Sequence, residues 1–157
     1  MSDEQQIELS LEQTGDYEFR VRFDGTSMPD ITTDEATPLG GDAGPNPARL
    51  LVVSVANCLS ASLLFALRKF KNAPGKLATK ARATLERNEH GRWRVTRIKV
   101  DVQLADAVPA LEHADRALLQ FEDFCVVTQS VREGVTVDVS VRDATGAVVH
   151  TSGAGLS

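Results

Sequence analysis

Residues 46–70, NPARLLVVSVANCLSASLLFALRKF, are the stretch that decides the fold. Asn46 followed by Pro47 is typical of a helix start, because Asn caps the first turn and proline fits the first helical position. Between Leu50 and Leu67 no residue is charged, so the predicted helix is apolar on nearly every face. A run of this length could span a bilayer. Three serines, an asparagine and a cysteine interrupt it, which favours a helix buried inside a protein core.

The segments around this helix alternate between apolar and polar residues with a period of two, which predicts β-strands. Residues 25–45 lack this alternation and contain four glycines and three prolines, which predicts a long loop. The sequence Asn88-Glu89-His90-Gly91 predicts a hairpin turn. The predicted strands cover residues 7–11, 17–23, 77–85, 93–104 and 135–141, with a short last strand around Val148.

A second helix is predicted from Pro109 to Arg132, with a break near Phe124 and an end at Gly134. Its apolar residues follow the three-four spacing of one helix face. They are Leu111, Ala114, Leu118, Phe121 and Cys125. We expect this face to pack against the helix that begins at Pro47.

Strands occur in pairs before, between and after the two helices, and this order is typical of an α+β fold. The prediction is one domain over residues 1–157, with an ordered core over roughly 7–149 and a long loop over 25–45. Two long buried helices would be packed between antiparallel sheets. Six strands of one chain cannot cover a helix that is apolar all round, so a second copy must do so. We therefore expect an obligate homodimer without a stable folded monomer.

The composition excludes several kinds of partner and site. The 157 residues carry a net charge of −5 and no basic block beyond residues 68–71, so nucleic acid is not an expected partner, and neither is a membrane. The three histidines, at 90, 113 and 150, lack metal-ligand spacing, and no phosphate-binding or dinucleotide motif occurs. We therefore expect no metal and no bound cofactor. The polar first six residues and the low cysteine count predict a cytoplasmic protein with reduced thiols.

Cys58 and Cys125 are the residues that could carry chemistry. Taken singly, each is more typical of a small buried hydrophobe, because free cysteine is among the most buried residue types. Cys58 also lies three turns into its helix, too far for that helix's own N-terminus to lower its pKa. Two cysteines on two helices that pack together allow another interpretation. If the sulfurs meet, one could attack an oxidised form of the other.

Two stretches resemble motifs of the OsmC/Ohr family. In the first, residues 44–51 contain the Asn-Pro that opens the long helix, and Ala56-Asn57-Cys58 follows. The second runs from Phe124 through Cys125 to Val131 and precedes the strand predicted over 135–141. The interval of 67 residues between the cysteines and the order of the elements also fit. The resemblance covers roughly residues 7–149.

This resemblance implies an intertwined homodimer with active sites at the subunit interface and, in one branch, reduction of organic hydroperoxides. Cys58 would be the peroxidatic cysteine, Cys125 the resolving one, and an external dithiol the reductant. A thiolate needs a cation nearby, and the resemblance implies an Arg from the N-terminal part, held by a Glu. Arg20 and Arg22 are the candidates. Ala48 stands where the peroxidase branch has that Glu, and Val126 where it has a Pro after the second cysteine.

The function expected from the sequence is therefore a thiol-dependent peroxidase that acts on a bulky organic hydroperoxide through a Cys58–Cys125 disulfide. The alternative is a non-catalytic protein that holds a small hydrophobic ligand in the same apolar interface. A thiol-based hydrolase is a weaker third interpretation, because no base is visible near Cys58.

Overall fold

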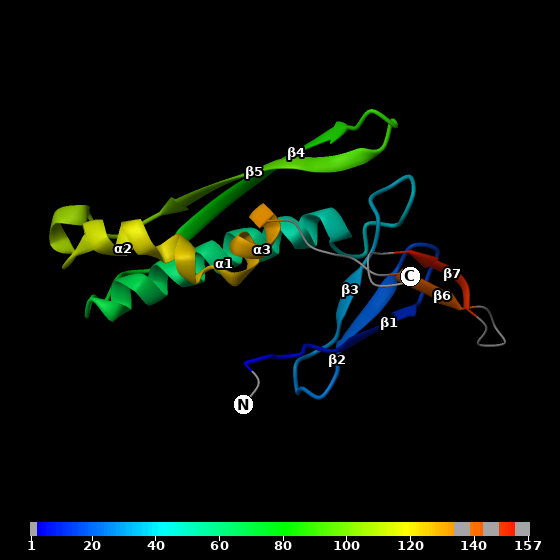
Figure 1. Ribbon diagram of the computed structural model, residues 1–157, viewed down its shortest axis with the longest axis horizontal. Helices are drawn as coiled ribbons and strands as arrows, with labels where there is room; N and C mark the ends of the chain where they lie inside the picture. Colours follow the sequence, from blue (N-terminus) through cyan, green and yellow to red (C-terminus); the bar gives the residue numbers. More distant parts are fainter. Residues whose placement is uncertain (1–2, 134–138, 143–147, 153–157) are drawn as a thin grey trace. The chain divides into compact units, whose positions relative to one another are not determined.

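The computed structural model describes residues 3–133, 139–142 and 148–152, and within them the chain is an α+β protein. The predicted helix end at Gly134 and residues 135–138 of the strand predicted over 135–141 lie outside the described residues. The described elements follow one another as three strands, α1, a β-hairpin, a series of short helices and a final pair of strands (Figure 1). Their contacts divide the chain into two compact units, residues 1–56 with 80–101 and residues 57–79 with 102–157.

The first unit begins with a three-stranded antiparallel sheet in the order β1-β2-β3. β1 is Leu9–Gln13, β2 is Phe19–Phe23 and β3 is Ile31–Thr33. Val21 pairs with Leu11 on one side and with Ile31 on the other, and its side chain is buried. The prediction that residues 25–45 are all loop is therefore wrong. β3 has only three residues, too few for an alternating pattern to stand out among glycines and prolines.

The rest of that loop is organised around the buried carboxylate of Asp34. It accepts hydrogen bonds from the backbone N–H groups of Glu35, Gly41 and Ala43, at 2.8, 2.9 and 3.1 Å. The bond from Ala43, together with the other two, holds the pKa of Asp34 below its ordinary value. The carboxylate thus fixes the turn that leads into α1.

The helix α1, Pro47–Lys69, agrees with the prediction at both ends. Asn46 Oδ1 accepts the Arg49 N–H at 3.0 Å, so Asn46 is the N-cap. The window of highest hydropathy in α1 averages 2.2, and 28% of it is buried. By length and composition this helix passes the test for a membrane span, a test that core helices of soluble proteins also pass.

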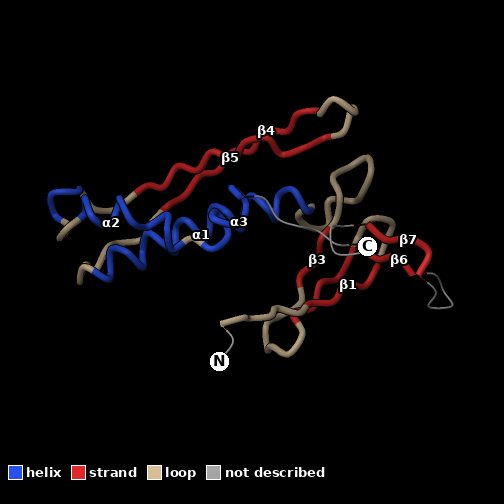
Figure 2. The backbone as a smooth tube through the Cα atoms, in the orientation of Figure 1, coloured by secondary structure: helices blue, strands red, loops and turns tan. Residues whose placement is uncertain are grey.

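After α1 the chain forms a hairpin of two long strands, drawn in Figure 2 as the extended red pair. β4 is Ala78–Arg87 and β5 is Trp93–Gln103. The Asn88 side chain accepts the backbone N–H groups of His90 and Arg92, at 3.0 and 2.9 Å, which closes the predicted turn. The Arg87 guanidinium lies 4.3 Å from the centroid of the Trp93 ring, a cation–π contact across the hairpin.

The second helix is not the long one that was predicted. Residues 108–110 form a 3₁₀ turn, α2 is Ala114–Gln120, a second 3₁₀ turn covers 121–124, and α3 is Val126–Glu133. The break expected near Phe124 is confirmed, one residue later. Pro109 opens only the first 3₁₀ turn, which ends where Leu111 adopts an extended conformation with φ −108° and ψ 133°. His113, in a left-handed conformation with φ 49°, then precedes α2.

The core of the second unit lies between the last turns of α1 and α2. Its buried members are Leu63, Ala66, Leu67 and Ala117. Leu118 was expected on the packed face of this helix, but its side chain is 42% exposed, and Ala117 is buried instead. Asn72 donates to the carbonyls of Leu67 and Glu112, at 3.0 and 2.9 Å, and so ties the end of α1 to the segment before α2.

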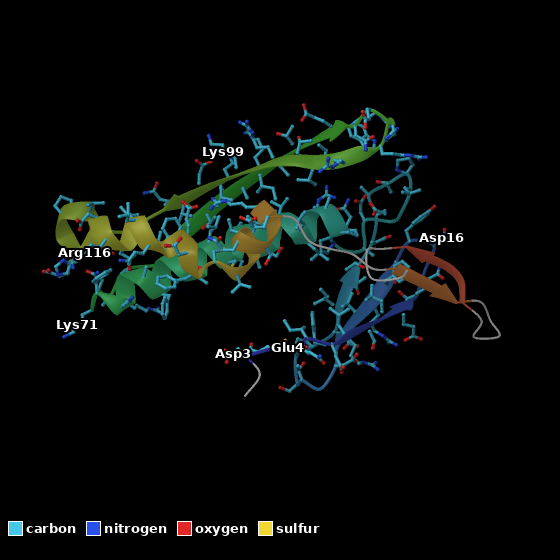
Figure 3. All side chains as sticks on the ribbon, in the orientation of Figure 1. Asp3, Glu4, Asp16, Lys71, Lys99 and Arg116 are labelled. Atoms are coloured by element: carbon cyan, nitrogen blue, oxygen red, sulfur yellow. The ribbon has the colours of Figure 1, made fainter. Side chains whose placement is uncertain are left out.

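Charged side chains project away from the backbone ribbon around these elements. Figure 3 shows Lys71 after α1, Lys99 on β5 and Arg116 on α2 in this orientation. The chain ends its described part with the antiparallel pair β6, Val139–Arg142, and β7, Val148–Ser152. The pairing of strands before, between and after the helices confirms the α+β class.

Candidate redox site

Both cysteines belong to the second unit, and both are free thiols. Cys58 lies three turns after the start of α1 and is partly exposed. Cys125 has no exposed surface. It sits at the break between the 3₁₀ turn and α3, in an extended conformation with φ −87° and ψ 91°.

Cys125 caps α3 through its sulfur. The N–H of Thr128, the third residue of the helix, donates to Cys125 Sγ at 3.4 Å, and the Cys125 thiol donates to Thr128 Oγ1 at 2.9 Å. The Cys125 carbonyl accepts the Gln129 N–H at 3.0 Å, the first bond of the helical ladder. A sulfur in this position faces the positive end of the helix dipole, which stabilises a thiolate.

Cys58 reaches the same helix end from α1. The Val127 N–H and the Ser62 hydroxyl hydrogen-bond to its sulfur, and its thiol is hydrogen-bonded to the Cys125 thiol. Ser62, one turn further along α1, also hydrogen-bonds to Cys125 and is itself buried. The structure thus brings the two predicted cysteines into direct contact at the N-terminus of α3. Their catalytic roles stay predictions.

The two sulfurs titrate in opposite directions. Burial raises the pKa of Cys58, and its hydrogen bond with Cys125 raises it further, against smaller effects of Val127 and Ser62. Burial also raises the pKa of Cys125, but its hydrogen bonds with Cys58, Thr128 and Ser62 together outweigh burial, so the pKa of Cys125 is lowered.

Arg20 and Arg22, the predicted cation candidates, lie on β2 in the first unit. Arg20 pairs with Glu12 and, at 3.8 Å, with Asp30, and Arg22 lies 3.7 Å from Asp30. Both side chains are about half exposed, at 45% and 60%. Neither arginine is among the groups that shift the pKa of Cys58.

An aromatic pair lies next to the thiols in the sequence. The rings of Phe65 and Phe124 meet edge to face with centroids 5.1 Å apart, and the Lys69 ammonium lies 5.3 Å from the Phe124 ring. Phe65 is two helical turns after Cys58, and Phe124 immediately precedes Cys125. Both rings keep exposed surface, 56% for Phe65 and 37% for Phe124.

Elsewhere the described residues offer little for chemistry. No group of three His, Cys, Asp or Glu side chains among them is placed to hold a metal ion. A hollow of about 290 Å³ in the first unit is lined by Asp16, Glu18, Asp34 and the loop around Gly40. The Asp34 carboxylate, which lines this hollow, already accepts hydrogen bonds from three backbone N–H groups. Its role is therefore to shape the loop that precedes α1.

Sequence reasoning found both cysteines but missed what surrounds them. Thr128 and Ser62 are buried polar residues beside the sulfurs, and neither was singled out. The signal for Thr128 was present in the sequence: a residue three positions after a helix break supplies the N–H that a capping side chain accepts. Ser62 gave no such signal, since it is one of three serines on an apolar helix.

The family model for OsmC-like proteins matches residues 40–140 of this chain. Among solved structures, an OsmC-like protein of unknown function from Vibrio cholerae is 14% identical with a TM-score of 0.65, over 80% of this chain and 93% of that one. The organic hydroperoxide resistance protein OhrB of Bacillus subtilis is 16% identical with a TM-score of 0.60, over 83% and 93%.

A third similar structure is an organic hydroperoxide resistance protein from Elizabethkingia anophelis with thiocyanate bound. It is 16% identical with a TM-score of 0.57, over 84% of this chain and 91% of that one. At such identities these structures show a shared fold. No curated protein matches the chain in sequence.

Proposed function

The chain belongs to the family of OsmC-like proteins, and on that premise we propose that it is a thiol-dependent peroxidase that reduces organic hydroperoxides. The observation that carries the proposal is the contact between two free thiols, one partly exposed and one enclosed, at the N-terminus of α3. Structural relatives named as organic hydroperoxide resistance proteins support it.

In the proposed reaction the Cys58 sulfur attacks the peroxide oxygen and becomes a sulfenic acid, while the alcohol leaves. The Cys125 sulfur then displaces the sulfenic hydroxyl and forms a disulfide with Cys58. An external dithiol reduces this disulfide and restores both thiols. The assignment follows access, because Cys58 is the sulfur with exposed surface and Cys125 has none.

An organic substrate suits the surroundings of this site. The exposed rings of Phe65 and Phe124 offer apolar surface to an alkyl or aryl group attached to the peroxide. Hydrogen peroxide has no such group and gains nothing from these rings. We therefore propose bulky organic hydroperoxides as the substrate class.

The cation for the thiolate remains a proposal about Arg20 and Arg22. Asp30 lies between the two guanidinium groups and can hold either in place, the task that the family assigns to a Glu absent at Ala48. A second function is favoured because, in the described part of the chain, no cation is among the groups that shift the pKa of Cys58. It is a non-catalytic protein that holds a small hydrophobic ligand against the exposed apolar residues.

We also propose that the chain acts as a homodimer in the cytoplasm. Leu51, Val53 and Phe65 of α1 are 36%, 58% and 56% exposed, so this helix presents large apolar side chains that the described residues do not cover. A second copy buries such a surface, and the hydrophobic effect then favours association.

The test of the proposed function is oxidation with one equivalent of cumene hydroperoxide followed by mass spectrometry of the intact chain. We expect loss of two hydrogens per chain and formation of cumyl alcohol. Cys58→Ser should abolish hydroperoxide consumption, and Cys125→Ser should leave a sulfenic acid on Cys58. Two unmodified thiols after this treatment would favour the ligand-binding function instead.

A further inference from the structure

Thr128 holds the Cys125 side chain by two contacts. The Thr128 N–H donates to Cys125 Sγ at 3.4 Å, and the Cys125 thiol donates to Thr128 Oγ1 at 2.9 Å. Both residues are enclosed, with 0% of Cys125 and 5% of Thr128 exposed. A cysteine side chain turns about a single carbon–carbon bond and has three staggered rotamers. Two contacts from the same residue therefore favour one rotamer of Cys125.

In this rotamer the Cys125 sulfur meets Cys58. The two thiols are hydrogen-bonded to each other, and the buried Ser62 hydroxyl contacts both. A disulfide requires the two sulfurs to come within about 2.05 Å of each other. The rotamer that Thr128 favours is therefore one from which Cys125 can reach Cys58 by a shift of the sulfurs.

We propose that Thr128 is the positioning residue for the disulfide-forming step. It keeps the Cys125 sulfur facing Cys58, so that a Cys58 sulfenic acid is resolved before a second hydroperoxide oxidises it to a sulfinic acid. The inference rests on the proposed function and deepens it, because it names the residue that protects Cys58 from irreversible oxidation. Thr128 acts through Cys125, so its effect falls on the second step and not on the attack of Cys58 on the peroxide.

The hydroxyl of Thr128 suits this role whichever charge the Cys125 sulfur carries. It accepts a hydrogen bond from the thiol, and by rotation of its own proton it can donate one to a thiolate. The N–H of the same residue donates to the sulfur in both cases. The hold on the Cys125 side chain therefore persists when this thiol ionises for its attack.

The disulfide-forming step balances without another reactant. Cys125 attacks the sulfur of the Cys58 sulfenic acid, the S–S bond forms, the S–O bond breaks, and the Cys125 proton leaves with the hydroxyl group as water. The Cys125 sulfur is oxidised and the sulfenic sulfur is reduced, both to the level of a disulfide. In the competing step a second hydroperoxide oxidises the sulfenic acid to a sulfinic acid and is itself reduced to the alcohol. The rate of attack by Cys125 decides between the two.

A chromogenic aromatic disulfide, dithiobis(nitrobenzoate), separates the two thiols in the full chain without a peroxide. Cys58, the partly exposed thiol, attacks it and releases one coloured thiolate, and Cys125 then displaces a second from the mixed disulfide. Thr128→Val should keep the first phase of colour release and slow the second by about five- to tenfold, the effect of one hydrogen bond of ordinary strength. Thr128→Ser, which keeps a hydroxyl, should restore the second phase.

Ser130→Ala is the matched control, because Ser130 lies on the same helix and its hydroxyl donates to the Val126 carbonyl. It should leave both phases unchanged. Thr128→Ala removes the same hydroxyl in a second way and replaces Thr128→Val if that variant does not fold. A second phase at the wild-type rate in either variant would overturn the inference, and so would failure of Thr128→Ser to restore this phase.

Over-oxidation measures the consequence for the proposed function. With excess cumene hydroperoxide, mass spectrometry should find more Cys58 sulfinic acid in Thr128→Val than in wild type or Ser130→Ala, with Cys125→Ser as the upper limit. An unchanged share of sulfinic acid in Thr128→Val would overturn the protective role. A chain that shows both phases of colour release as expected but consumes no hydroperoxide would contradict the proposed function and leave the positioning of Cys125 by Thr128 intact.

Discussion

The two helical stretches of this chain, residues 47–69 and 108–133, carry one cysteine each and differ in continuity. The first is a single helix of 23 residues with Cys58 in its interior. The second is divided into 3₁₀ turns and two short helices, with Cys125 at the last break. An interior helical position has no free N–H groups to offer, whereas a break exposes those of the next helix.

The break changes the surroundings of both cysteines. If residues 108–133 were continuous, the N–H groups of Val127 and Thr128 would be bonded within the helix, and Cys125 would be a small core residue. Because the helix restarts at Val126, these groups face the two sulfurs instead. The chemistry that we propose depends on the break at least as much as on the cysteines.

The largest expected effect concerns the exposed face of the continuous helix. Phe65→Glu should abolish the homodimer and with it the folded structure, because a carboxylate buried in an apolar interface costs several kcal/mol. Sedimentation of the wild type should give about twice the chain mass of 17.0 kDa. Arg68→Glu, at an exposed position less than one turn further along α1, is the matched control and should stay dimeric. A well-folded wild-type monomer at low micromolar concentration would contradict the dimer.

A smaller effect tests the break itself with proline at two positions of α3. Val126 is the first helical residue and Cys125 before it is extended, so Val126→Pro should change the free energy of unfolding by less than about 1 kcal/mol. Val131→Pro lies inside α3 and should lower that free energy by about 3 kcal/mol. Urea unfolding measures both. Equal losses at the two positions would mean that the helix does not begin at Val126.

Much of this molecule could be predicted from its sequence, for physical reasons that differ by element. The start of α1 was predictable because Asn46 and Pro47 act locally, and the β4–β5 hairpin because Asn88 sets its own turn. β3 was missed because it is stable only through its pairing with β2, which no local pattern reveals. The breaks on both sides of α2 were only partly predicted, since the left-handed conformation of His113 has no sequence signature.

The site follows the same division. The identity of the two cysteines could be inferred from the resemblance and from their helix positions, but their contact could not, because it depends on how α3 meets α1. The opposite directions of the two pKa shifts also depend on that contact, since the hydrogen bond between the sulfurs raises the pKa of Cys58 and lowers that of Cys125. The sequence-based interpretation considered only the dipole of α1, on which Cys58 lies. The helix N-terminus that the two sulfurs face is that of α3.

The smallest expected effect sharpens the comparison at the other helix start. Asn46 caps α1 by accepting the Arg49 N–H, and its amide also donates to Glu35 at 3.1 Å. Asn46→Ala should lower the free energy of unfolding by about 1 kcal/mol through loss of the cap. Asn46→Ser keeps a capping oxygen and loses only the bond to Glu35, so it should recover most of that loss. Asn57→Ala, at an exposed interior position of α1, is the control and should be neutral or slightly stabilising, because Ala is the better helix former. If Asn46→Ser were as destabilising as Asn46→Ala, the contribution of Asn46 would lie in its bond to Glu35, and the start of α1 would depend on the preceding loop and not on a local cap.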